Sequence, residues 1–284
     1  MVDLVVSTSI LVVLALAALV FGVVTAFGGR RKFDRVEREG TSVLLGRGPM
    51  ELAHFSLEPF GRAAVALGLS ANAITLVSLI LGLGAGVAIA MGHFGIGCGL
   101  STVSALFDTL DGMVARLTKT SSDSGETFDA AVDRYNEFFF LAGLAYVFRQ
   151  DARILVLVLA ALLGSFMVSY ATAKAEALHV KPPRGAMRRA ERATYLTLGV
   201  GLVPISMRFA QSGLAGIAPV LIALGLVAIV GNVSAARRIF AVARLAAERD
   251  QAAPASSTPS ASETAPPEPV PVEIGATAAP AESR

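Results

Sequence analysis

Long apolar stretches recur along this chain and constrain its fold more than any other feature. A helix needs about 20 predominantly apolar residues to cross a bilayer. Hydrophobic residues make up 54% of the chain and charged residues only 16%, which is typical of membrane proteins rather than soluble ones. The pattern predicts an all-α integral membrane protein with spans at 4–27, 71–91, 96–116, 125–148, 153–174, 193–210 and 215–236.

The first stretch has two interpretations, a cleaved signal peptide or a retained span. A signal peptide carries basic residues before its apolar core, whereas here the basic cluster Arg30–Lys32 follows it. We therefore expect residues 1–29 to form a membrane anchor whose C-terminal end is cytoplasmic. Residues 30–69 are polar and then amphipathic, which favours an interfacial helix over a simple cytoplasmic linker.

Composition predicts the state of the C-terminal segment, and the distribution of basic residues predicts the orientation of the spans. Residues 250–284 are dominated by Pro, Ala, Ser and Glu, a composition that predicts a disordered cytoplasmic tail. With six further spans after the anchor, most basic residues of the connections fall on one side, which the positive-inside rule makes cytoplasmic. The net charge of +2 is too small to indicate a nucleic-acid partner.

Four aspartates lie where two apolar stretches meet. Asp108 and Asp111 are three residues apart, and Asp129 and Asp133 are four apart, so each pair shares one face of a helix. An ionisable group at the centre of a membrane helix costs about 2.5–3.5 kcal/mol on insertion scales. Facing carboxylates suit Mg²⁺, Mn²⁺ or Ca²⁺, and no His or Cys accompanies them. The alternative is a set of helix-end aspartates in solvated loops.

Two glycines and an arginine extend this pattern. Gly112 follows Asp111 and Gly125 precedes Asp129 by one helical turn, so neither position adds a side chain beside the carboxylates. Arg116 lies near the same helix end and offers donors suited to a phosphate. A cation site, a phosphate-binding arginine and cleared space together predict diphosphate chemistry.

The complete string reads D-x2-D-G-x2-A-R-x8-G-x3-D-x3-D, with Ala115 as its alanine. It resembles the CDP-alcohol phosphatidyltransferases, membrane enzymes of phospholipid biosynthesis. The resemblance implies a six-helix catalytic core over residues 70–249, to which this chain adds one N-terminal transmembrane helix. It also implies a homodimer in the cell (inner) membrane with the active site facing the cytoplasm.

The same resemblance implies roles for the motif residues. Two Mg²⁺ or Mn²⁺ ions would be held by Asp108, Asp111, Asp129 and Asp133. The CDP-diphosphate of CDP-diacylglycerol would be bound by Asp111, Gly112, Ala115, Arg116 and Gly125. Asp133 would be the catalytic base that accepts the proton of an alcohol, which attacks the phosphatidyl phosphorus and displaces CMP.

A second basic segment bears on the acceptor alcohol. The pattern SYxxAxAE…RAER over residues 169–193 resembles the subgroup that makes phosphatidylinositol phosphate, and it predicts an acceptor-phosphate site of Lys174, Arg189 and Arg192. That subgroup has a lysine and an arginine where this chain has Thr172 and Lys174, so one contact differs. Inositol phosphate is the predicted acceptor. Glycerol 3-phosphate is the alternative, as is a CDP-alcohol donor with a lipid acceptor. Ordinary cytoplasmic charge explains Lys181 and Arg184.

Two other classes also place acidic residues in membranes. Intramembrane prenyltransferases use aspartates on diphosphates, but their DDxxD-like cluster is absent from this sequence. A divalent-cation carrier would continue its carboxylates across the bilayer, whereas these gather at one face. Cytidine release distinguishes the first class, and metal uptake into vesicles the second.

Overall fold

The computed structural model describes residues 1–28, 48–181, 185–210 and 213–252, and within these ranges the chain is helical with no strand. Residues Met1–Ala246 form one compact unit, and Ala247–Arg284 are a second. The predicted basic cluster at 30–32, residue 184 and the predicted disordered tail beyond 252 lie outside the described ranges. The helices are α1 (Val2–Gly28), α3 (Gly48–Ala66), α4 (Ala71–Ala90), α5 (Phe94–Leu117), α6 (Asp123–Val147), α7 (Ala152–Ala177), α8 (Arg189–Phe209) and α9 (Leu214–Ala252).

Short polar side chains begin several of these helices. The Ser70 hydroxyl accepts the Ala73 N–H at the start of α4, and the Ser122 hydroxyl accepts the Gly125 N–H at the start of α6. Asp151 accepts two backbone N–H groups at the start of α7. Such caps satisfy donors that have no partner within the helix. They explain why the helices begin within a few residues of the predicted spans.

The last helix continues beyond its predicted membrane span. The predicted span ended at residue 236, but α9 is a single helix of 39 residues, about 58 Å long at 1.5 Å per residue. That length exceeds the roughly 30 Å hydrocarbon core. Residues 237–249 contain strong helix formers and neither Gly nor Pro, so nothing in the sequence ends the helix earlier.

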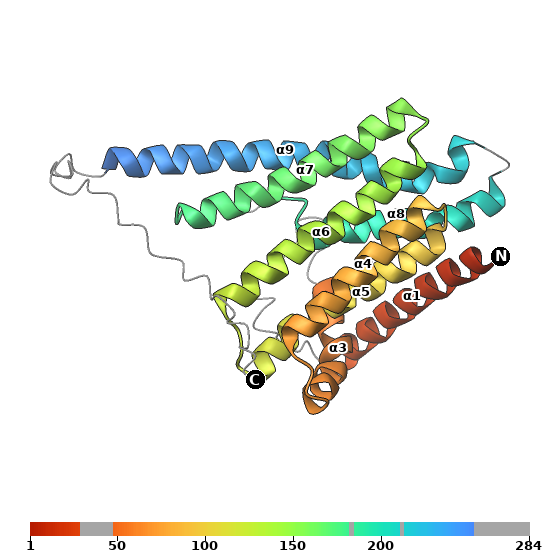
Figure 1. Cartoon of the computed structure of the whole chain (residues 1–284), viewed down its shortest axis with the longest axis horizontal. Helices are drawn as coiled ribbons and strands as arrows, with labels where there is room; N and C mark the ends of the chain where they lie inside the picture. The colour runs from red at the N-terminus through yellow and green to blue at the C-terminus, as the bar shows by residue number, and fades with distance from the viewer. Residues whose placement is uncertain (29–47, 182–184, 211–212, 253–284) are drawn as a thin grey trace, which may run out of the picture. The chain divides into compact units, whose positions relative to one another are not determined.

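Helix α4 packs between α5 and α6 (Figure 1). Glycines allow its close approach to α6. A Cβ at Gly143 would overlap the Gly86 carbonyl, and a Cβ at Gly86 would overlap the Phe139 carbonyl. Small residues let helix backbones approach closely in membranes. This packing brings the end of α5 and the beginning of α6, which carry the four aspartates, to the same end of the helix group.

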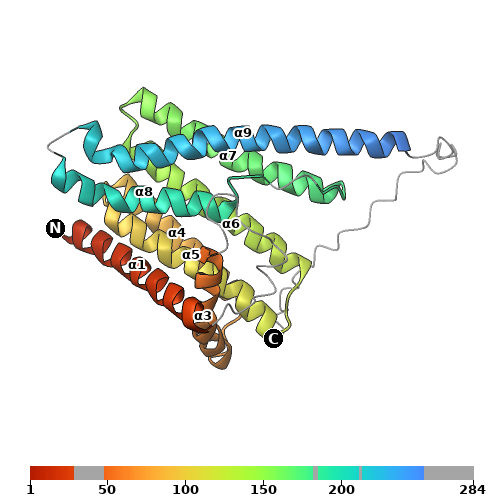
Figure 2. The same ribbon diagram turned by 180° about the vertical axis from the view of Figure 1, so that it is seen from behind.

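Helices α7, α8 and α9 complete the main buried cluster, with α7 packed against α6 and α8 against α5 and α1 (Figure 2). The Asn232 side chain of α9 donates a 2.8 Å hydrogen bond to the Ala160 carbonyl of α7. Ser101 of α5 and Thr197 of α8 place their hydroxyl oxygens 3.1 Å apart. Helix α8 begins beside the aspartate-bearing end of α5, where its first residue, Arg189, pairs with Asp108.

Four helices in the described part of the chain are long and apolar enough to cross a membrane: α1, α4, α7 and α9. The other predicted spans form helices too, but α5, α6 and α8 do not meet this criterion. Helix α6 shows the reason, because its first 15 residues include Asp123, Glu126, Asp129, Asp133 and Glu137. The amphipathic segment before the core also forms a helix, α3, while its place at the membrane interface stays a prediction.

Candidate metal and phosphate site

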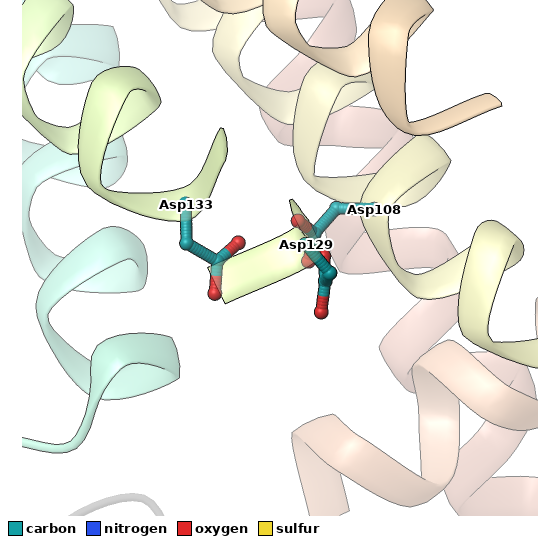
Figure 3. A group of neighbouring side chains, drawn as sticks. All are labelled: Asp108, Asp129 and Asp133. Atoms are coloured by element: carbon teal, nitrogen blue, oxygen red, sulfur yellow. The ribbon is translucent and has the colours of Figure 1, made fainter. Parts of the chain in front are cut away.

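Three of the four predicted metal ligands converge. Asp108 lies on α5, and Asp129 and Asp133 lie one turn apart on α6. One carboxylate oxygen from each lies within 4.8 Å of the others. Figure 3 shows Asp133 and Asp108 reaching this point from opposite sides, with Asp129 between them. An all-oxygen donor set of this kind matches a hard divalent cation, so these residues fit the predicted metal.

Asp111 lies beside this group but is held differently. Its side chain is buried, and the Thr75 hydroxyl of α4 donates a 2.5 Å hydrogen bond to its Oδ2. The oxygens that converge within 4.8 Å are those of the other three aspartates. The predicted role of Asp111 as a fourth ligand stays a prediction. Thr75 was not predicted, and one hydroxyl within an apolar stretch gives little signal in a sequence.

Arg189, the first residue of α8, reaches into the aspartates. Its two terminal nitrogens donate to the two oxygens of Asp108, at 2.8 and 2.9 Å, and Nη2 also pairs with Asp133. The arginine side chain remains 35% exposed, whereas those of Asp108 and Asp133 are 13% and 11% exposed. A residue predicted to bind the acceptor phosphate therefore lies against the predicted catalytic base.

Arg189 remains protonated beside these carboxylates. Burial alone would lower the pKa of its guanidinium, but the Asp133 and Asp108 carboxylates outweigh burial and raise that pKa above the ordinary value. The guanidinium keeps its positive charge and a fork of donors. It can therefore pair with carboxylates or with a phosphate in the same geometry.

Arg192 lies one turn further along α8 and has a different environment. It is fully buried. Its Nε and Nη2 donate to the two oxygens of Glu137, at 2.7 and 2.9 Å, and its Nη1 donates to the Met187 carbonyl at 2.7 Å. These bonds engage every nitrogen of the guanidinium. The predicted contact of Arg192 with the acceptor phosphate stays a prediction.

Glu137 is a site residue that the sequence analysis missed. It follows Asp133 by four residues, as Asp133 follows Asp129, so the three carboxylates form one stripe along α6. Arg189 and Arg192 are three residues apart on α8. This spacing, together with that of the carboxylates on α6, was the signal that could have identified Glu137 as a partner of Arg192. Two acidic turns of α6 thus meet two basic positions of α8.

The residues predicted to bind the CDP-diphosphate gather around the end of α5 and the start of α6. Gly112 and Ala115 are half-buried and Arg116 is exposed. A Cβ at Gly125 would lie 3.2 Å from the Ser122 hydroxyl oxygen that caps α6, so this glycine also keeps the cap undisturbed. Their roles toward CDP stay predictions.

The remaining predicted acceptor residue, Lys174, is exposed on α7, as is Thr172 one half-turn before it. Arg238 of α9 donates a 3.0 Å hydrogen bond to the Thr172 hydroxyl and a 2.9 Å bond to the Gly185 carbonyl. Arg238 therefore brings a guanidinium to the Thr172 side chain. No sequence pattern indicated this contact, because Arg238 lies 66 residues from Thr172.

Comparison with known proteins gives these residues a context. The sequence profile described as CDP-alcohol phosphatidyltransferase matches residues 69–230. The chain is 29% identical over 173 residues to the phosphatidylinositol phosphate synthase of Corynebacterium glutamicum, covering 59% of this chain and 77% of that protein. It is 30% identical over 122 residues to the archaetidylinositol phosphate synthase of Pyrococcus horikoshii, covering 42% of this chain and 62% of that protein.

Solved structures give the same fold. Crystal structures of Mycobacterium tuberculosis phosphatidylinositol phosphate synthase, one with CDP-DAG and one with manganese and citrate, each match with a TM-score of 0.58 at 24% identity. Each match covers 65% of this chain, and 92% and 87% of the two solved chains. Together with the apolar helices, these findings make the chain an integral membrane protein.

Proposed function

The chain belongs to the CDP-alcohol phosphatidyltransferase family, and we propose that it transfers the phosphatidyl group of CDP-diacylglycerol to inositol phosphate, releasing CMP. Membership of a transferase family favours this over the prenyltransferase and the cation carrier. Two relatives named for inositol phosphate products differ in their lipid, one phosphatidyl and one archaetidyl. What their names share is the inositol phosphate, which supports this acceptor for the present chain.

The observation that carries the proposal is the position of Arg189. Its guanidinium lies against both Asp108 and Asp133, so the residue type that binds phosphate and the carboxylate proposed as base meet at one point. An acceptor whose phosphate pairs with Arg189 would hold its free hydroxyl close to Asp133. A non-phosphorylated alcohol has no group for that contact.

The proposed cofactor is a pair of Mg²⁺ or Mn²⁺ ions held by Asp108, Asp129 and Asp133, with Asp111 completing the set. Bound divalent cations would neutralise the diphosphate and stabilise charge on the leaving CMP. The convergence of three carboxylates within 4.8 Å supports this assignment. So does the donor chemistry, since it contains neither sulfur nor imidazole.

The side chains of this site divide the remaining work. Asp133 accepts the proton of the acceptor hydroxyl, whose oxygen attacks the phosphatidyl phosphorus. The bond from phosphorus to CMP breaks, and CMP leaves with its electron pair.

The other side chains bind and orient the two substrates. Arg116 and the surfaces at Gly112, Ala115 and Gly125 receive the CDP-diphosphate. Arg189 orients the acceptor, with Lys174 and Arg238 adding positive charge nearby. Proximity and orientation account for most of the acceleration, because a carboxylate near cations is a weak base.

Arg192 has a supporting part in this proposal. By binding Glu137 and the Met187 carbonyl, it fixes the beginning of α8 against α6. Arg189 is three residues before it on the same helix. The buried pair thus positions the arginine that meets the acceptor phosphate.

We further propose that residues 70–249 form a six-span catalytic domain, preceded by the anchor 1–29 and the interfacial segment 30–69 and followed by a tail at 250–284. The aspartates would face the cytoplasm of an inner-membrane homodimer. Cysteine accessibility supports or refutes the orientation: Asp123→Cys, in the exposed first turn of α6, should react with an impermeant reagent only from the cytoplasmic side.

CMP release by the purified protein tests the function. The protein is supplied with CDP-diacylglycerol and Mg²⁺ and offered inositol phosphate, inositol, glycerol 3-phosphate or serine. We expect release that depends on inositol phosphate and that EDTA abolishes. Stimulation by glycerol 3-phosphate alone would replace the acceptor and keep Arg189 as its phosphate ligand. No CMP with any acceptor would favour a CDP-alcohol donor with a lipid acceptor and would refute the reaction as proposed.

A further inference from the structure

Helix α1 packs against α5 and α8 and lies beside α5 in Figures 1 and 2, although it precedes the family's matched residues. Among the described side chains of α1, those of one face are covered. Ser7 is fully buried and Asp3, Leu4 and Ile10 are half-buried, at spacings of three and four residues. Side chains on the other face are exposed, including Val5, Val12, Val13 and Leu16. A helix that served only as an anchor would not need a face buried against the catalytic helices.

Glycines on α5 form the surface that α1 contacts. A Cβ at Gly95 would overlap the Asp3 carbonyl, and a Cβ at Gly99 would lie 2.8 Å from Ile10 and 3.5 Å from Val6. The two glycines are one turn apart on the same face of α5. This is the small-residue arrangement that lets membrane helices pack backbone to backbone. Contact therefore extends from Asp3 to Ile10 of α1.

Two polar contacts fix α1 along its partners. The Asp3 carboxylate accepts the Ile96 N–H of α5 at 3.0 Å, while His93, at the N-cap of α5, makes no side-chain capping bond. Asp3 thus supplies from α1 the cap that α5 lacks. The buried Ser7 hydroxyl donates to the Gly201 carbonyl of α8. One helix is attached to both α5 and α8 through neighbouring turns.

Helices α5 and α8 are antiparallel, and three contacts define how they slide against each other. At the α1 end, a Cβ on Gly201 would lie 2.6 Å from the Cys98 sulfur. In the middle, Ser101 meets Thr197. At the other end, Arg189 pairs with Asp108. Asp108 lies about 20 Å along α5 from the first α1 contacts at 1.5 Å per residue. A slide of a single residue at one end therefore displaces the ion pair by about 1.5 Å at the other.

We propose that α1 sets the sliding register of α5 and α8, and that Ser7 is a positioning residue that holds Arg189 at Asp108 from the opposite end of the helices. The consequence for acceptor binding rests on the proposed function, whereas the register itself does not. Helix α1 thus acts as a seventh structural member of the catalytic unit.

A disulfide between α5 and α8 measures the register without reference to activity. Ser101→Cys and Thr197→Cys, in a Cys98→Ala background, replace two hydroxyls that lie 3.1 Å apart. Ser7→Leu places a bulky side chain where α1 meets Gly201. Its control is Ser9→Leu, the same change at an exposed position of the same helix. We expect Ser7→Leu to slow disulfide formation about tenfold and Ser9→Leu to leave it unchanged. Equal rates in the two variants would overturn the proposal.

A smaller substitution at the same position tests the proposal if Ser7→Leu does not fold. Ser7→Ala removes only the hydroxyl, and the loss of one interhelical hydrogen bond in a membrane corresponds to about a threefold effect. We expect Ser7→Ala to slow the disulfide by about this factor relative to Ser9→Ala. Should Ser7→Leu fail to accumulate, this pair decides the question, and identical rates would again refute the positioning role.

Kinetics then connect the register to the site. Ser7→Leu should raise KM for inositol phosphate about tenfold, with kcat and KM for CDP-diacylglycerol within about twofold, because the slide moves Arg189 while α4 holds α5 to α6. Closing the engineered disulfide between positions 101 and 197 in that variant should restore the acceptor KM, and reduction should raise it again. A KM that the disulfide does not restore would refute the link. If no acceptor supports turnover in the parent, the proposed function fails while the disulfide rates still test the register.

Discussion

Arg189 and Arg192 lie three residues apart at the start of α8, yet their surroundings are opposite. Arg189 is 35% exposed and shares its donors between Asp108 and Asp133. Arg192 is fully buried, and its donors are taken up by Glu137 and the Met187 carbonyl. A partly exposed guanidinium can exchange one anionic partner for another, whereas a buried one cannot without leaving a charge unpaired. We infer that Arg189 meets the substrate and Arg192 holds the helix.

The largest effect is expected at the carboxylate that Arg189 contacts. Asp133→Asn keeps the side-chain size but removes the base, so we predict a fall in kcat of about 10²- to 10⁴-fold, the usual range for general-base catalysis. Binding of CDP-diacylglycerol, measured by equilibrium titration, should be largely retained. Asp123→Asn, in the exposed first turn of the same helix, is the control. Undiminished turnover in the Asp133 variant would remove Asp133 from the mechanism.

The buried pair should respond in stability rather than in chemistry. Arg192→Gln leaves Glu137 without its partner, and removing one member of a buried ion pair costs about 3–5 kcal/mol. The double change Arg192→Met with Glu137→Leu should recover most of that loss, because apolar replacement of both partners is often neutral. Unfolding in detergent provides the measurement. If Arg192→Gln raised only the acceptor KM and left stability intact, Arg192 would be a phosphate ligand, as the sequence predicted.

Arg189→Lys tests the difference between Arg189 and Arg192, because lysine keeps the positive charge but lacks the paired donors of the guanidinium. Lysine cannot make the bidentate contact that arginine makes with a planar anion. We predict a rise of about tenfold in KM for inositol phosphate, which corresponds to roughly 1.4 kcal/mol, with thermal stability unchanged. Arg237→Lys, at an exposed position of α9, should change neither quantity. A loss of stability instead would give Arg189 the structural role assigned to Arg192.

Thr75→Val, the last change of the series, is expected to affect metal binding alone. Valine fills the same space but cannot donate to Asp111. Loss of a partner that orients a metal-binding carboxylate weakens metal affinity about tenfold. Mn²⁺ titration of the purified protein measures this directly, and Thr127→Val, whose hydroxyl bonds to the Asp123 carbonyl within α6, is the comparison. Equal affinities in the two variants would indicate that Asp111 takes no part in binding the metal.

Local features of the sequence were predictable, whereas contacts between distant segments were not. Ser70, Ser122 and Asp151 cap helices close to where apolar composition placed the spans. The aspartate spacing predicted four facing carboxylates, and those of Asp108, Asp129 and Asp133 do converge. The meeting of Arg189 with Asp108 joins positions 81 residues apart. No periodicity in either helix specifies that contact, since it depends on how α5 and α8 pack.

Arg192 and Thr75 also show that contacts between distant segments are not predictable from sequence alone. A basic residue near a membrane face is equally consistent with a phosphate ligand, a buried ion pair or a solvated charge. Spacing makes Glu137 a candidate partner of Arg192, but the packing of α8 decides that the two meet. Only the approach of α4 to α5 brings Thr75 to Asp111. The end of α9 was not predictable for a different reason, because apolarity marks a membrane span but does not end a helix.

Discrimination between inositol phosphate and free inositol tests the central claim most directly. The measurement compares kcat/KM for the two acceptors in the parent and in Arg189→Gln, each with CDP-diacylglycerol and Mg²⁺. We predict that the parent prefers the phosphorylated acceptor and that Arg189→Gln loses most of this preference by failing on inositol phosphate alone. An Arg189→Gln enzyme that keeps the full preference would contradict the account, because some other residue would then hold the acceptor phosphate.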